Sequence, residues 1–188
     1  MPLYLSMEDR LFKDTSATKR IFSLTKRIRA VAGGTAASKT ISILVWLIDY
    51  AQSTKDEIIT VVSESYPHLE GGAMRDFKNI MGGDFRDEDW NRTDFIYRFS
   101  SGSVIEFTSA DVPSKFTGGR RDILFANEAN HIARDTFRQA DMRTRLFTIA
   151  DWNPESEFWF HQEQLADDSD SVYIHTTYLD ALEVLPEQ

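Results

Sequence analysis

Short apolar runs recur along this chain, separated by polar or small-residue segments. Five of them, at 28–32, 58–62, 123–126, 146–150 and 172–176, have the length of strands, and the run at 58–62 is continuous and β-branched. Uninterrupted apolar runs of this length are typical of strands buried on both faces of a parallel sheet. We therefore expect these five runs to be the central strands.

Helix signals and one hairpin signal lie between the runs. Residues 41–51 form an apolar run of helix length, and Pro67 is suited to open a second helix. Its expected buried stripe ends before Gly82-Gly83 and consists of Leu69, Met74, Phe77 and Ile80. Residues 95–99 and 103–108 alternate around a Ser-Ser-Gly turn, as in a β-hairpin. The pattern predicts an α/β fold with a largely parallel central sheet flanked by helices, plus a β-hairpin.

At 188 residues the chain has the length of one ordinary domain. We expect an N-terminal arm or leading helix at 1–27, the main domain at 28–178, and the start of a linker at 179–188. No apolar run reaches the length of a membrane span, and the N-terminus lacks a signal-peptide core, which predicts a soluble cytoplasmic protein.

The composition of the chain excludes several classes of functional site. The chain has no cysteine, which excludes disulfides, thiol catalysis and Cys-based zinc sites, and its four histidines show no metal-ligand spacing. The net charge is −9, with ten acidic residues and no Lys or Arg in 151–188. An acidic total argues against a domain that holds nucleic acid over its whole surface, although it leaves room for local contacts.

The segment that carries most chemistry lies between the first strand and the first long helix. It reads Gly33, Gly34, Thr35, Ala36, Ala37, Ser38, Lys39, Thr40. A small-residue loop between a strand and a helix N-terminus is the setting of a phosphate-binding (P-loop, Walker A) site. In that interpretation Lys39 reaches the β- and γ-phosphates and the Thr40 hydroxyl coordinates Mg²⁺. The usual pattern has Gly where Ser38 stands, and Ser lacks the conformational freedom of Gly.

A second candidate segment follows the strand at 123–126. Asn127 and Glu128 come directly after it, in the layout of a Walker B segment. Glu128 is the predicted general base for the water that attacks the γ-phosphate. Asn127 occupies the position of a metal-orienting Asp and is expected to act through a metal-bound water. An Asn127→Asp substitution is accordingly expected to tighten binding of magnesium-nucleotide.

Two further groups of polar residues are candidates. Asp151 and Asn153 end the strand at 146–150, and either is placed to sense the γ-phosphate, although Asn-Pro is also a simple turn signal. Arg120 and Arg121 follow Gly118-Gly119. An arginine there is suited to act as a finger in trans, to contact DNA phosphates, or to do neither.

Together, Gly33–Thr40, the segment at 123–130 and Asp151-Trp152-Asn153-Pro154 resemble the N-terminal ATPase domain of the large terminase subunit of tailed bacteriophages. The resemblance runs from about Phe22 to the end of the chain. It includes Val62-Ser63-Glu64 and the segment 176–180. Many members have Arg at the position of Thr35, which turns attention to Arg120 or Arg121 as the finger.

The resemblance implies an ATPase motor that uses ATP and Mg²⁺ to translocate double-stranded DNA into a procapsid in the host cytoplasm. It implies a homo-oligomeric ring, a portal protein and a small terminase subunit as partners. It also implies that Asp151–Asn153 is the coupling segment. The nuclease domain of the family would begin where this chain stops, so no DNA cleavage is expected from it.

Three other interpretations remain open from the sequence. One is a related nucleic-acid-dependent ATPase such as a helicase, although a helicase core normally has two such domains. Another is a regulator that binds nucleotide without hydrolysing it, in keeping with Ser38 and Asn127. The third is a structural capsid or adaptor protein in which the glycine loop binds nothing.

Overall fold

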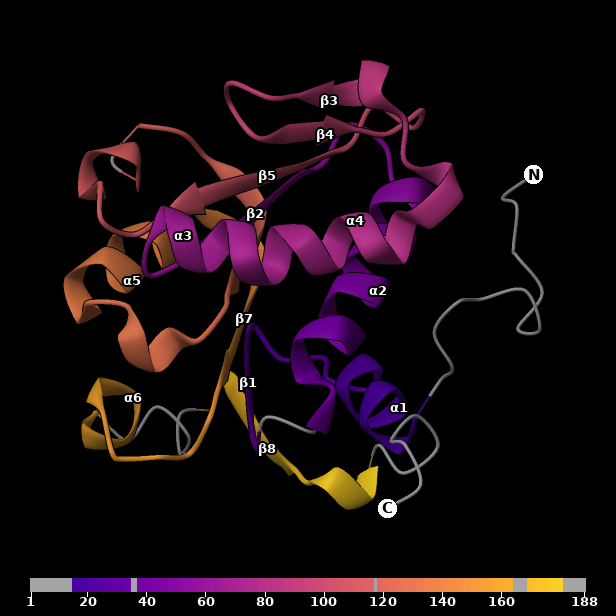
Figure 1. Ribbon diagram of the computed structural model, residues 1–188. Coiled ribbons are helices and arrows are strands. Elements are labelled where there is room, and N and C mark those ends of the chain that lie inside the picture. Colours follow the sequence, from indigo (N-terminus) through magenta and orange to yellow (C-terminus); the bar gives the residue numbers. More distant parts are fainter. Residues whose placement is uncertain (1–14, 35–36, 117, 164–168, 181–188) are drawn as a thin grey trace.

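A computed structural model describes residues 15–34, 37–116, 118–163 and 169–180 (Figure 1). The strands are β1 (Ile28–Gly33), β2 (Ile58–Ser63), β3 (Trp90–Asn91), β4 (Ile96–Arg98), β5 (Val104–Ser109), β6 (Arg121–Ala126), β7 (Thr144–Trp152) and β8 (Ser171–Thr176). The α-helices are α1 (Ser16–Phe22), α2 (Lys39–Ser53), α3 (Tyr66–Leu69), α4 (Arg75–Met81), α5 (Arg134–Asp141) and α6 (Trp159–Gln162). Short helical turns follow or precede several of these elements.

The eight strands form one sheet in the order β3-β4-β5-β2-β6-β7-β1-β8. All pairings from β5 to β8 in this order are parallel, and only the hairpin pairings β3–β4 and β4–β5 are antiparallel. The predicted fold class and the predicted hairpin are therefore confirmed. Neighbours in the sheet are often distant in sequence, since β7 lies between β1 and β6.

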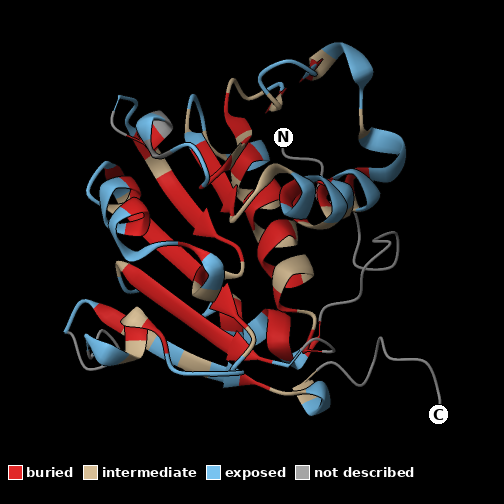
Figure 2. Cartoon of the chain, turned by 60° about the vertical axis from the view of Figure 1, so that its left-hand side comes forward, coloured by how far each residue is buried: buried red, intermediate tan, exposed pale blue. Residues whose placement is uncertain are grey.

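Helices cover both faces of the sheet. In Figure 1, α5 and α6 lie to one side of β7 and β1, and α1 and α2 lie to the other. Successive residues of a strand face opposite sides of the sheet. Ile123 and Phe125 belong to the core on the side of α1, α2 and α4, whereas Leu124 belongs to the core on the side of α5 and α6. Figure 2 shows the central strands almost wholly buried. This two-sided burial explains why β2 and β6 are rich in apolar residues.

The helical segment after Pro67 is less regular than the sequence predicts. It consists of α3, a π-helical turn at Glu70–Met74, and α4, because Gly72 has non-helical angles of φ −114° and ψ −107°. The predicted stripe still faces the core: Leu69, Met74 and Phe77 are buried, and Ile80 packs against them. The segment ends at Gly82, which has a positive φ of 49°, as predicted from its glycines.

Strand β7 is longer than the sequence predicts. It runs to Trp152 rather than ending at Ala150, so Asp151 lies inside the strand and not in the loop beyond it. The reason is pairing: Asp151 is matched with Val31 of β1 and Trp152 with Ala32. A buried acidic residue is thereby held within the sheet, near the carboxyl end of β7.

The ends of the chain are described only in part. Helix α1 lies within the predicted leading segment 1–27, and residues 1–14 fall outside the described residues. Most of the predicted linker at 179–188 does so as well. None of the described helices is both long enough and apolar enough to cross a membrane.

Phe77 on α4 should be a sensitive point of the core. Its ring is fully buried and contacts the rings of Phe85, Tyr97 and Phe107. Replacing it with Ala removes these contacts and leaves a cavity, which typically lowers the free energy of unfolding by about 3–5 kcal/mol. Chemical denaturation of Phe77→Ala should show this loss. Asn79→Ala, an exposed position on the same helix, should change stability by less than about 0.5 kcal/mol.

Candidate active site

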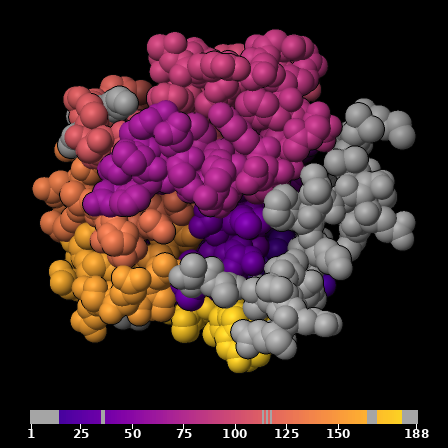
Figure 3. Space-filling view, in the orientation of Figure 1, coloured from indigo at the N-terminus to yellow at the C-terminus, as the bar shows by residue number. Residues whose placement is uncertain are grey.

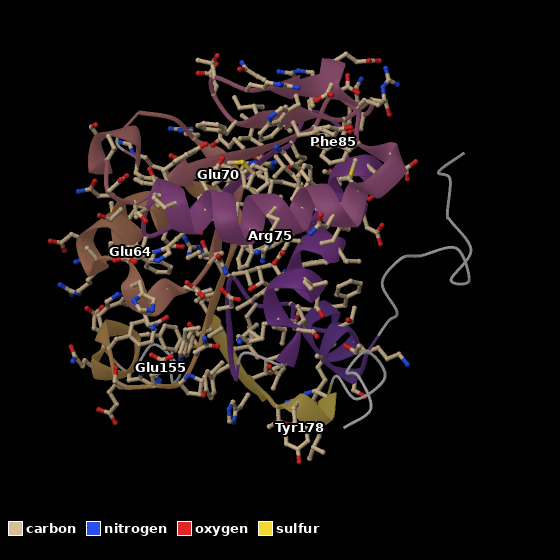
Figure 4. The ribbon with its side chains drawn as sticks, viewed as in Figure 1. Glu64, Glu70, Arg75, Phe85, Glu155 and Tyr178 are labelled. Atoms are coloured by element: carbon tan, nitrogen blue, oxygen red, sulfur yellow. The ribbon has the colours of Figure 1, made fainter. Side chains whose placement is uncertain are left out.

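The predicted site residues gather at the carboxyl edge of the parallel strands. Gly33 ends β1, Asn127 and Glu128 follow β6, and Asp151 and Asn153 lie at the end of β7. Glu64 and Glu155, which follow β2 and β7, are labelled on the same side of the molecule in Figure 4. Ligands of open α/β sheets bind at this edge because the loops there come from adjacent parallel strands.

Gly33 is required by its neighbour on the outermost strand. A Cβ atom at this position would overlap both the carbonyl oxygen and the hydroxyl of Thr176 on β8. The close approach fixes the start of the phosphate loop against β8. Thr35 and Ala36 fall outside the described residues, so the predicted cradle is described only at Gly33, Gly34 and the segment 37–40.

Ser38 adopts the backbone conformation for which the usual motif has glycine. Its φ of 51° and ψ of 24° lie in the left-handed region, immediately before α2. A non-glycine residue in this region carries strain of about 1–2 kcal/mol. The substitution at Ser38 is therefore accommodated by strain rather than by a change in the loop, and its carbonyl still accepts the helical hydrogen bond from the Ser42 N–H.

Lys39 is buried in the first turn of α2, and its ammonium group lies against the backbone of Gly33 and Gly34. The Nζ atom donates to the carbonyls of Gly33 (2.6 Å) and Gly34 (3.1 Å) and to Oδ1 of Asn153 (3.0 Å). Burial lowers the pKa of Lys39, and the carboxylates of Asp151 and Glu128 oppose part of that shift. The charge is thus fully coordinated by protein oxygens and lies beside the phosphate loop.

Thr40, the next residue of α2, contacts Asn127. The amide of Asn127 donates to the hydroxyl of Thr40 (3.2 Å), and its Oδ1 accepts from the hydroxyl of Ser63 at the end of β2 (3.1 Å). Asn127 therefore contacts the predicted magnesium ligand directly. It does so as a hydrogen-bond donor, which is the opposite of what a metal-orienting carboxylate would provide.

Asp151 supplies the acceptor at this position. One carboxylate oxygen accepts from the Thr40 hydroxyl (2.9 Å), and the other accepts from the Asn127 amide (3.1 Å) and the backbone N–H of Glu128 (2.9 Å). The residue is only 1% exposed. Burial raises the pKa of Asp151, while the nearby Lys39 charge and these three hydrogen bonds act against the rise.

Glu128 is held in an unusual backbone conformation directly after β6. Its φ of 53° and ψ of 53° are left-handed, and its N–H is fixed by Asp151. Its side chain is half-buried, and no hydrogen bond or ion pair holds the carboxylate among the residues that the structure describes. Only four non-glycine residues in the described ranges have positive φ, and Ser38 and Glu128 are two of them. Strain of this kind is characteristic of functional sites.

The two predicted sensor residues have different positions. Asn153 contacts the ammonium of Lys39, whereas Asp151 contacts the hydroxyl of Thr40. Two residues that contact the site, Ser63 and Thr176, were not predicted as site residues. The signals for them in the sequence are their place at strand ends and the resemblance that covers both segments.

The position of Arg121 is incompatible with its predicted role as an arginine finger. It begins β6, at the opposite edge of the sheet from Glu128, and is only 4% exposed. Its guanidinium donates to the hydroxyl of Thr60 (3.0 Å) and the carbonyl of Ala140 (2.7 Å). A buried group tied to its own sheet cannot reach the nucleotide of a neighbour. Arg120 is exposed and remains a candidate.

The donors around Thr40 fit a magnesium ion bound together with nucleotide phosphates. Mg²⁺ takes oxygen ligands, keeps several waters, and is commonly held by few protein groups when phosphates are present. A hydroxyl beside a buried carboxylate meets that requirement. Within the described ranges no three His, Asp or Glu side chains are grouped to hold a metal ion without such phosphates.

Comparison by sequence finds no relative: no protein-family model and no curated protein matches this chain. Comparison by structure finds phage proteins. The large terminase of a thermophilic bacteriophage superposes with a TM-score of 0.79 at 15% identity, covering 93% of this chain and 48% of that one. The ATPase domain of the Thermus phage P74-26 large terminase, in a mutant form, gives 0.72 at 15% identity, covering 97% of this chain and 88% of that one.

A third similar structure is the bacteriophage Phi-29 viral genome packaging motor assembly, with a TM-score of 0.63 at 16% identity over 90% of this chain and 58% of that one. This chain spans about half the length of the thermophilic phage's large terminase and nearly the whole P74-26 ATPase domain. The predicted resemblance therefore holds for the architecture: the chain has the fold of the ATPase domains of phage large terminases.

Proposed function

We propose that this chain is the ATPase motor domain of a viral DNA-packaging terminase, hydrolysing ATP to translocate double-stranded DNA into a procapsid. One observation carries the proposal. Lys39 and Thr40 at the start of α2 lie at the same sheet edge as the free carboxylate of Glu128, on a fold shared with terminase ATPase domains. These are the groups that phosphate binding and water activation require.

Nucleotide binding would exchange the partners of Lys39. In the structure its ammonium is satisfied by two loop carbonyls and Asn153. Phosphate oxygens carry full negative charge and form stronger hydrogen bonds with an ammonium than neutral carbonyls do. Lys39 would turn from these acceptors to the β- and γ-phosphates. Asn153 would lose its partner in the same event, which supports its role as the sensor.

Thr40 would provide the protein ligand to Mg²⁺, which supplies charge neutralisation of the phosphates when bound. Asp151 and Asn127 hold the Thr40 hydroxyl in place from β7 and β6. Because both partners are buried in the sheet, the hydroxyl is fixed before any ligand arrives. Such preorganisation lowers the ordering that binding would otherwise require.

Hydrolysis would use Glu128 as the general base. Its backbone is fixed by Asp151, while no hydrogen bond or ion pair with a described residue holds its carboxylate, so the carboxylate is available to accept a proton from the attacking water. Arg120 is the candidate for a finger that stabilises charge at a neighbour's site in a ring.

The structural relatives support nucleotide binding and assembly. Structures of the thermophilic phage's large terminase are in complex with ADP and with ATP-γ-S, and the Phi-29 structure is a packaging motor assembly. On this basis we propose ATP and Mg²⁺ as cofactors and a homo-oligomeric ring as the working state. We further propose double-stranded DNA, a portal protein and a small terminase subunit as partners in the host cytoplasm, and no nuclease activity from this chain.

The interpretation of this chain as a regulator that does not hydrolyse ATP rested on Ser38 and Asn127. The structure accommodates both: Ser38 takes up the glycine conformation, and Asp151 lies beside Asn127.

Release of inorganic phosphate, measured with and without double-stranded DNA, distinguishes a motor, a regulator and an adaptor. A motor requires release that DNA stimulates, a regulator binds ATP without release, and an adaptor binds no nucleotide. A helicase-like ATPase would respond to single-stranded nucleic acid instead.

Lys39→Ala should abolish nucleotide binding. The change removes the only charge within the loop, and with it the main attraction for the phosphates. Titration with a fluorescent ATP analogue measures the affinity directly. Lys19→Ala, at an exposed position on α1, is the matched control and should bind as wild type does. An unchanged affinity of Lys39→Ala would refute the phosphate-loop assignment.

Glu128→Gln should bind ATP with normal affinity and lose hydrolysis by about 10²-fold or more, because an amide cannot accept the proton of the attacking water. Single-turnover phosphate release in the assembly that hydrolyses ATP measures this loss. Glu155→Gln removes an exposed carboxylate at the same edge and should leave turnover unchanged. Near-normal turnover of Glu128→Gln would place the base elsewhere.

Arg120→Ala should lower turnover in the ring at equal nucleotide occupancy, by an amount on the scale of about 10³-fold if it is the finger. The activity of the wild-type chain should also rise with protein concentration, since the finger comes from a neighbour. Arg138→Ala on the exposed face of α5 serves as the control. Activity that is independent of concentration and insensitive to Arg120→Ala would remove the finger in trans.

A further inference from the structure

We propose that Asp151 supplies, from β7, the carboxylate that orients the magnesium ligand Thr40, in place of the residue at position 127 directly after β6. The inference rests on the proposed nucleotide site and adds a positioning role that neither the sequence pattern nor the structural relatives assign. Its basis is the geometry of two adjacent strands and one hydroxyl.

The register of the sheet makes the two positions equivalent. Strands β6 and β7 are parallel neighbours, and Ala126 is paired with Ala150. The next residues, Asn127 directly after β6 and Asp151 near the end of β7, therefore lie side by side. Each contacts the Thr40 hydroxyl, at 3.2 Å from Asn127 Nδ2 and 2.9 Å from Asp151 Oδ2, and the two contact each other at 3.1 Å. An acid and an amide thus share one position relative to Thr40.

The direction of the hydrogen bonds shows which residue has the carboxylate's role. Asn127 donates to Thr40 Oγ1, and Thr40 donates to Asp151. The lone pair of Thr40 that remains can face a cation only while its proton is directed to an acceptor. Asp151 is that acceptor, and it adds a negative charge close to the hydroxyl. Asn127 holds Asp151 in place and contributes no charge.

The surroundings of Asp151 leave its charge without a contacting cation. Its hydrogen-bond donors are a hydroxyl, an amide and a backbone N–H, all neutral. Within the described ranges no Lys, Arg or His nitrogen lies within ion-pair distance of it, and Lys39 acts only through space. A buried carboxylate is costly unless a cation or metal compensates it. A magnesium ion beside Thr40 would provide that compensation.

This arrangement reverses the sequence-based expectation for Asn127→Asp. A carboxylate there would meet the carboxylate of Asp151 across a contact that is now 3.1 Å. Two buried like charges at such a separation repel strongly. The substitution should therefore destabilise the site rather than tighten binding of magnesium-nucleotide.

The test is a charge exchange between the strands, using Asp151→Asn, Asn127→Asp and the double variant with both changes. The readout is the binding of a fluorescent, non-hydrolysable ATP analogue, measured in EDTA and across a Mg²⁺ titration. Asp151→Asn should shift the Mg²⁺ midpoint upward by about 10–100-fold, the usual effect of losing a group that orients a metal ligand. Affinity in EDTA should stay near wild type, because Lys39 is unchanged.

The double variant should return the Mg²⁺ midpoint to within a few fold of wild type, since the acid and the amide have only exchanged strands. Thermal unfolding of each variant shows whether it is folded, and the double variant decides the question if Asp151→Asn is not. A wild-type midpoint in Asp151→Asn, equal losses with and without Mg²⁺, or a double variant that remains impaired would each overturn the proposal. Absence of nucleotide binding by the wild-type chain would instead refute the proposed function.

Discussion

The buried carboxylate of Asp151 is the interaction on which the geometry of the candidate site depends. It joins three elements: α2 through Thr40, β6 through Asn127 and the Glu128 N–H, and β7 by its own position. Burying a carboxylate is costly, and the three hydrogen bonds that its oxygens accept offset part of that cost. The requirement to satisfy this one group fixes the phosphate-loop helix relative to the candidate base.

Strain is concentrated where this network meets the loops. Ser38 and Glu128 both take left-handed conformations, one immediately before α2 and the other immediately after β6. Neither has the freedom of glycine, so packing and hydrogen bonding elsewhere must hold them there. The Glu128 N–H bond to Asp151 and the helical bond accepted by Ser38 do this. Figure 3 shows the chain around α2, in indigo, between the helical segment 66–81 and the orange C-terminal part.

The role of each polar residue follows from strand order rather than from motif spacing. Because β7 lies between β1 and β6, its end stands between the phosphate loop and Glu128. Asp151 and Asn153 therefore have different partners: Asp151 contacts Thr40, and Asn153 contacts Lys39. Closeness in sequence does not bring Arg121 to the site. It is seven residues from Glu128 but lies at the other end of β6, buried against Thr60.

The sequence by itself determined the fold class, the parallel strands and the hairpin, since two-sided burial leaves continuous apolar runs and a hairpin leaves alternation. It also placed the phosphate loop and Glu128 at strand ends, because those signals are local. It did not indicate that β7 extends to Trp152 or that Arg121 is buried. Only the tertiary structure decided that Asp151 contacts Thr40, because these residues are 111 positions apart in the sequence and only the packing of α2 against β7 brings them together.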